Sequence, residues 1–168
     1  MYKELEIEKW SRKDHFRFFS QFEEPFFGVT VQLDCTKAHA YSKKHGVSFF
    51  LYYLHCSLVA ANQARPFRYR IQEHRVLVYE KTNASQTINR PDGTFGFSYM
   101  EYDADFESFH LSAKKEIERV QKSTGLQPAV SGENVIHYST LPWINFSSLS
   151  HARSFALKDS CPKFPMGK

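Results

Sequence analysis

The strongest periodic pattern in the sequence lies between residues 103 and 122. Its apolar side chains recur every three or four positions, at Phe106, Phe109, Ala113, Ile117 and Val120. This spacing places them on one face of a helix, and a helix with one apolar face packs that face against another element. The chain is therefore expected to fold in layers, with this helix covering a sheet or other helices.

Other segments supply the remaining layers. Alternating or apolar runs predict strands at 29–34, 67–71, 75–80, 86–88, 94–100, 135–140 and 143–148. Helical patterns predict further helices at 11–22, 36–45 and 48–62. The order of these elements predicts a single domain over residues 1–168, of α/β (α+β) class, with helices packed on a mixed β-sheet.

Helix boundaries carry more specific signals. Ser11 followed by Asp14 resembles a capping box, so a helix is predicted to begin there. Thr36 is expected to cap the next helix, and Gly46 follows that helix where a left-handed residue is favoured.

Charge and cysteine content exclude several classes of protein. The net charge is +4, but the 22 basic and 18 acidic residues are interleaved, which predicts a solvated surface and no nucleic-acid partner. The three cysteines form no C-x-x-C pair, so neither a disulfide framework nor a metal site is expected. The most apolar stretch, 47–61, is too short and polar for a membrane span, and the N-terminus resembles no leader. A cytoplasmic protein is predicted.

Three of the histidine positions could bear on chemistry. His55 and His110 lie beside apolar stripes, where a packed histidine with its hydrogen bonds satisfied is the favoured interpretation. His137 and Ser139 are two residues apart on a predicted strand and therefore share a face. A base beside a hydroxyl can activate it, but a polar ladder without catalytic function is the favoured interpretation of this pair.

Aromatic residues are concentrated near the N-terminus. Six phenylalanines lie within residues 16–27. They are interpreted either as core residues or as the wall of a pocket for a flat, apolar ligand, and composition does not separate the two.

Five ordered blocks of the sequence resemble chloramphenicol acetyltransferases. They are W-S-R-K-D-H-F at 10–16, T-V-Q-L-D-C-T at 30–36, S-F-F at 48–50, S-T-L-P-W-I-N-F at 139–146 and F-P-M-G-K at 164–168. The resemblance spans essentially the whole chain. It implies a fold of the CoA-dependent acyltransferase type and a homotrimer with active sites between subunits. It also implies antibiotic resistance through transfer of acetyl from acetyl-CoA, without a metal, to the primary hydroxyl of chloramphenicol.

The resemblance also assigns roles to individual residues. Ser139 matches the family serine that supports the oxyanion, and His137 stands at a position of the drug pocket. The remaining residues expected to line that pocket are Phe18, Phe19, Phe27, Phe95, Leu126 and Leu149. Arg12 matches an arginine that pairs with an aspartate of the family's H-H-x-x-x-D-G motif, and His15 matches a structural position.

The second histidine of that motif is the family's catalytic base, and the sequence contains no adjacent histidines. The chain is therefore expected to be a C-terminally shortened subunit that lacks the final strand and the histidine segment. Without a positioned base, its activity is expected to be impaired. The alternative is a non-catalytic protein that binds an apolar ligand or another subunit.

Overall fold

The computed structural model describes residues 1–126, 132–151 and 159–168. Its α-helices are α1 (Lys13–Phe19), α2 (Thr36–His45), α3 (Phe49–Gln63) and α4 (Phe106–Lys122). Two short 3₁₀ helices are η1 (Ile7–Lys9) and η2 (Arg65–Arg68). The strands are β1 (Tyr2–Glu4), β2 (Tyr69–Gln72), β3 (Arg75–Tyr79), β4 (Asn83–Asn89), β5 (Phe95–Met100), β6 (Val135–Leu141) and β7 (Lys163–Gly167). None of the helices in these ranges combines the length and apolar character needed to cross a membrane.

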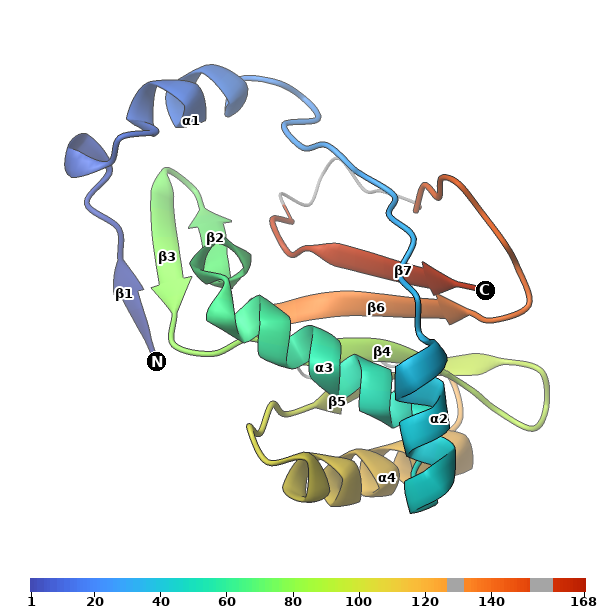
Figure 1. Ribbon diagram of the computed structural model, residues 1–168. Helices are drawn as coiled ribbons and strands as arrows, with labels where there is room; N and C mark the ends of the chain where they lie inside the picture. Colours follow the sequence, from blue (N-terminus) through green and yellow to red (C-terminus); the bar gives the residue numbers. More distant parts are fainter. Residues whose placement is uncertain (127–131, 152–158) are drawn as a thin grey trace.

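The strands form two sheets (Figure 1). The smaller sheet is antiparallel, with the order β1-β3-β2, and the larger sheet has the order β5-β4-β6-β7. In the larger sheet β4 pairs antiparallel with β5, whereas β6 is parallel to both β4 and β7. The prediction of helices packed on a mixed β-sheet is therefore confirmed.

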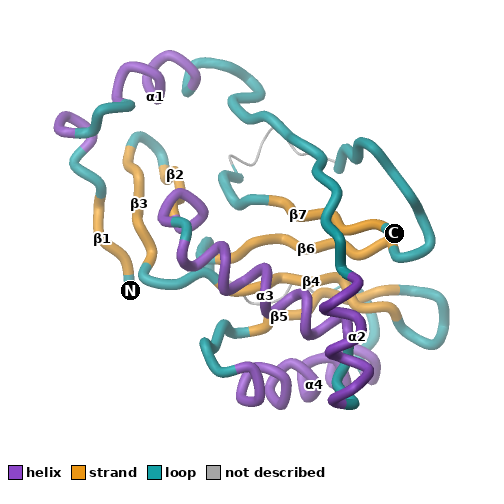
Figure 2. The backbone as a smooth tube through the Cα atoms, in the orientation of Figure 1, coloured by secondary structure: helices purple, strands orange, loops and turns teal. Residues whose placement is uncertain are grey.

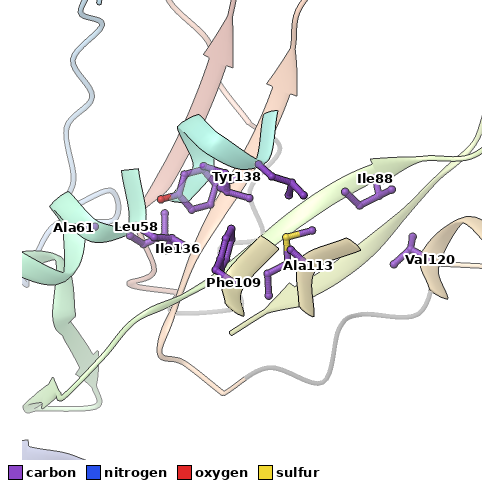
Figure 3. Packing of buried hydrophobic residues seen from close by; sticks show 12 residues of the cluster. Leu58, Ala61, Ile88, Phe109, Ala113, Val120, Ile136 and Tyr138 are labelled. Carbon is purple, nitrogen blue, oxygen red and sulfur yellow. The ribbon is translucent and has the colours of Figure 1, made fainter. Parts of the chain in front are cut away.

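The core lies between the larger sheet and two helices, α3 and α4 (Figure 2). From α3 come Leu54, Leu58 and Ala61, and from α4 come Phe109, Ala113 and Val120 (Figure 3). These side chains meet Ile136 and Tyr138 of β6. The apolar stripe predicted for α4 is confirmed, since three of its members are at most 1% exposed, and α3 likewise buries three apolar side chains that are at most 2% exposed.

The helix boundaries confirm some of the predicted signals and correct others. Gly46 ends α2 in the left-handed conformation (φ 65°), as predicted. The predicted capping box at Ser11 is wrong, because α1 begins at Lys13 and its N-cap residue, Arg12, makes no side-chain capping bond. Thr36 is the first residue of α2 rather than its cap, and its N–H donates to Asp34 Oδ1 at 2.9 Å.

Two predicted strands are wrong. Residues 29–34 are extended but pair with no neighbour, and Val29, Val31 and Leu33 are 70–80% exposed. Residues 143–148 also form no strand, and Trp143 at their start is 62% exposed. An alternating pattern becomes a strand only when an edge is available to pair with it. Among the described residues neither segment forms a ladder, and the second makes a single bond next to a strand, from the N–H of Lys168 after β7 to the carbonyl of Ile144 at 2.9 Å.

Two strands were missing from the prediction. β1 consists of exposed residues, and β7 contains Pro165. Both are edge strands, where proline and polar side chains are tolerated because one side of the strand needs no partner. Their pairing depends on the neighbouring strand rather than on their own composition.

Arg70 of β2 joins the two sheets. Arg70 is 1% exposed, and its guanidinium donates to five oxygens: the carbonyls of Phe67, Tyr69, Glu133 and Val135, and the hydroxyl of Thr82. Val135 begins β6, so these bonds fix the smaller sheet against the start of a central strand of the larger one.

Candidate active site

The face of the larger sheet opposite α3 and α4 carries the candidate site. Ile136 and Tyr138 pack in the core, so the alternate residues His137 and Ser139 project from the other face. In the parallel register His137 lies opposite Lys163 of β7, and Ser139 lies opposite Pro165. The predicted sharing of a face by His137 and Ser139 is thus confirmed, and β7 extends the same polar surface.

Ser139 is partly exposed near the end of β6. Among the described residues, no hydrogen bond to its hydroxyl is formed. The neighbouring Thr140, on the core face, instead accepts from Tyr53 at 3.2 Å. A hydroxyl that is ordered on a strand and has no protein partner is available to donate to an oxygen of a bound ligand.

His137 is half-buried, and its backbone N–H donates to the carbonyl of Pro162 at 2.9 Å. Burial lowers the pKa of its imidazole below the usual value, and the nearby carboxylate of Asp159 only partly opposes this shift. The ring is therefore neutral at neutral pH. A neutral imidazole accepts a proton or binds a metal, and contributes no positive charge.

The predicted aromatic lining does not converge within one chain. Phe18 and Phe19 lie on α1, 59% and 49% exposed, with their ring centroids 5.2 Å apart. Phe27 is 89% exposed in the segment between α1 and α2. Phe95 starts β5, on the far side of β7, β6 and β4 from α1 in Figure 1.

The other predicted residues are also separate. Leu126, after α4, is 61% exposed, and Leu149 is partly buried beyond β6. Arg12 and His15, at the start of α1, are both exposed. Their assigned roles stay predictions.

Two surface hollows lie elsewhere among the described residues. One lies between β5 and α4 and is lined by Tyr99, Met100, Glu101, Ser112, Lys115, Glu116 and Arg119. The other is lined by Thr30, Gln32, Asn145, Phe146 and Ser147. Neither includes a predicted pocket residue. The second does bring the extended segment 29–34 beside the residues that follow β6.

The other two histidines considered above behave as expected. His55 is 7% exposed, and its Nε2 lies 3.0 Å from the carbonyl oxygen of Asp103. His110 is partly buried and stacks on Phe106 with ring centroids 5.5 Å apart. Both are packed side chains rather than members of the site.

Two residues beside His137 were not predicted. Asp159 and Cys161 precede β7, and their side chains approach His137 so that the three potential ligand atoms lie within 4.8 Å of one another. Nothing in the sequence signals this proximity, because more than twenty residues separate His137 from the other two. It follows from the parallel pairing of β6 with β7.

Comparison with known proteins gives a consistent result. The family model described as chloramphenicol acetyltransferase matches residues 1–168. The chain is 28% identical to a chloramphenicol acetyltransferase of Bacillus pumilus, over 100% of this chain and 77% of that protein. It is 24% identical to one of Proteus mirabilis, over 98% of this chain and 76% of that protein. A solved structure described as chloramphenicol acetyltransferase matches with a TM-score of 0.89 and 30% identity, over 100% of this chain and 82% of that one.

Proposed function

Since the chain belongs to the chloramphenicol acetyltransferase family, we propose that it transfers the acetyl group of acetyl-CoA to a hydroxyl of chloramphenicol or of a similar small acceptor. Such a reaction inactivates the antibiotic and gives resistance. The observation that carries the proposal is the match of the family model to all of residues 1–168. Because acetyl-CoA is a cytoplasmic metabolite, the proposed site of action is the cytoplasm.

The reaction defines what the site must do. The acceptor oxygen attacks the thioester carbonyl carbon, and the proton of the acceptor hydroxyl passes to a base. The carbonyl oxygen then becomes the oxyanion of a tetrahedral intermediate. Collapse of that intermediate expels the CoA thiolate, which takes up a proton, and leaves the acetyl ester. Donors aimed at the oxyanion stabilise the transition state more than the ground state.

Ser139 is the proposed donor to the oxyanion. Its hydroxyl has no partner among the described residues and projects from the sheet face opposite the core. Pro165, opposite it on β7, has neither an N–H nor a hydroxyl to share this task.

Residues 1–168 provide no established general base for the acceptor hydroxyl. In the family, by the resemblance described above, it is the second histidine of H-H-x-x-x-D-G, and these 168 residues contain no adjacent histidines. General-base catalysis contributes roughly 10²–10⁴-fold to the rate. We therefore expect turnover by these residues alone to be slower than in the relatives by about that factor.

A homotrimer is the proposed assembly. Phe27, Val29, Val31 and Leu33 are 70–89% exposed in the single chain, an apolar run that a second copy can cover. Phe18 and Phe95 lie far apart in the single chain, which also favours an assembly of several copies. A pocket lined by both side chains needs contributions from more than one chain.

The decisive test measures CoA thiol release with a chromogenic thiol reagent, using purified protein, acetyl-CoA and chloramphenicol. Release that depends on chloramphenicol, with acetylated drug detected by mass spectrometry, supports the proposal. Saturable quenching of Trp10 and Trp143 fluorescence by chloramphenicol, with no thiol release over many hours, would instead identify a ligand-binding protein. That second candidate is favoured only because residues 1–168 contain no adjacent histidines.

A further inference from the structure

Three side chains of metal-binding type meet on the polar face of the larger sheet. They are His137 of β6 and the two residues Asp159 and Cys161, which precede β7. One potential ligand atom from each lies within 4.8 Å of the others. We propose that His137, Asp159 and Cys161 form a binding site for a divalent transition metal of the zinc type.

The backbone holds this cluster together. The N–H of His137 donates to Pro162 at 2.9 Å, and the parallel ladder continues from there as His137 pairs with Lys163. The carboxylate of Asp159 accepts the N–H of Cys161 at 2.8 Å, which fixes the turn that presents both side chains. The positions of all three residues therefore depend on hydrogen bonds of the sheet and the turn.

The set of ligands suits zinc. Thiolate, imidazole and carboxylate are its usual protein ligands, and sites with three protein ligands keep a fourth position for water or another ligand. Metal–ligand bonds of roughly 2.0–2.3 Å put tetrahedral ligand atoms about 3–4 Å apart. Closing the observed separation of up to 4.8 Å requires side-chain rotation, in which the Cys161 thiol gives up its hydrogen bond to the carbonyl of Glu133 at 3.2 Å.

Metal binding requires the thiolate form of Cys161 and the neutral form of the His137 imidazole. Binding therefore displaces the proton of the Cys161 thiol, and the affinity for the metal should rise with pH.

Two neighbouring cationic side chains limit the affinity of the proposed site for a metal ion. Lys163 forms an ion pair with Asp159 at 2.5 Å, and its side chain is 37% exposed. Arg70 raises the positive potential around Cys161 but is held by its five oxygen acceptors. A carboxylate has about four lone-pair sites, so Asp159 can bind the metal through one of them. Lys163 can then turn toward solvent, which removes its positive charge from the metal.

Titration of the metal-free protein with Co²⁺ tests the site directly. We expect one equivalent to bind, with a thiolate-to-cobalt charge-transfer band in the near ultraviolet, and Zn²⁺ to displace it. If no such band develops in excess Co²⁺ and equilibrium dialysis retains no stoichiometric Zn²⁺, the proposal is overturned. This readout needs no acetyl transfer, so it is independent of the proposed enzymatic function.

Single substitutions then identify the ligands. Cys161→Ser should abolish the charge-transfer band, and His137→Ala or Asp159→Asn should weaken Zn²⁺ binding beyond the roughly 10–100-fold typical of outer-shell changes. Lys163→Met should tighten binding. Cys56→Ser and His74→Ala, at exposed positions elsewhere, are the matched controls and should change nothing. A band that survives in folded Cys161→Ser, checked by circular dichroism, would overturn the assignment.

Discussion

Ser139 of β6 lies opposite Pro165 of β7 in the parallel ladder, two residues along the strands from the pair of His137 and Lys163. The two pairs have different chemical surroundings on the polar face of the sheet. The first pair offers a single hydroxyl donor, and the second lies beside the carboxylate and thiol of the proposed metal site.

The first prediction concerns Ser139. Replacing it by alanine removes the proposed donor to the oxyanion, so kcat should fall roughly 10²–10³-fold while the KM for chloramphenicol changes little. Thiol-release kinetics measure both constants. Ser147→Ala, at an exposed position beyond β6, is the control and should leave both unchanged. An unaltered kcat in Ser139→Ala would remove this residue from the mechanism.

The second prediction concerns Arg70. Methionine at this position fills the space but leaves buried carbonyls without a donor, so the free energy of unfolding should fall by at least about 2 kcal/mol. Urea denaturation measures the change. Arg75→Met is the control: Arg75 is exposed and lies 3.9 Å from Glu4, a surface pair worth about 0–1 kcal/mol. Equal losses in the two variants would contradict the proposed link between the sheets.

The third prediction concerns Gly96 of β5. A methyl group there would lie 2.7 Å from Val120 Cγ1 and 2.5 Å from Arg90 Nη2. Val120 is buried in the core and cannot move freely, so Gly96→Ala should destabilise the protein by about 1–3 kcal/mol. Gly28→Ala meets nothing within 4 Å and is the matched control. A thermal melt in which the two variants behave alike would show that α4 can shift away from β5.

The fourth prediction concerns pH. Burial by itself raises the pKa of Glu116, but hydrogen bonds from Arg119 and from the Tyr99 N–H outweigh it, so the pKa lies below its ordinary value of 4.5. A lowered folded-state pKa means that the stabilisation is complete above pH 4.5 and is lost as the pH falls through the folded value. Glu116→Gln should therefore flatten the acid side of the stability profile.

Urea denaturation between pH 3 and pH 7 measures that profile. Glu118→Gln, at an exposed position on the same helix, is the control and should keep the slope of the unsubstituted protein. An identical slope for Glu116→Gln would mean that its bond to β5 contributes nothing.

The fifth prediction concerns assembly. Val31 is 70% exposed in the single chain, so a carboxylate there should be tolerated by the monomer but not by an interface that buries it. Val31→Asp should thus abolish trimers in sedimentation velocity without lowering the melting temperature of the monomer. Leu111→Asp, on the exposed face of α4, is the control and should still assemble as the unsubstituted chain does.

Several features of this protein follow from the sequence alone. The periodic stripe of α4, the helix at α3, the left-handed Gly46 and the successive strands β2 and β3 are all predicted, because each depends on residues close together in the chain. The shared face of His137 and Ser139 was also predictable, since the alternation of a strand is a local property. Blocks such as residues 10–16 and 139–146 indicate the family from the sequence alone, because each block is a run of consecutive residues.

Other features were decided only by the tertiary structure. Val29 and Leu33 belong to an alternating pattern typical of a strand, yet no strand edge among the described residues pairs with their segment. Nothing near Arg70 in the sequence indicates that it is buried, yet five oxygens surround its guanidinium. Cys161 has no cysteine or histidine close to it in the sequence, but the pairing of β7 with β6 brings it next to His137. Sequence patterns report local preference and burial, whereas pairing and proximity depend on which distant segments the fold brings together.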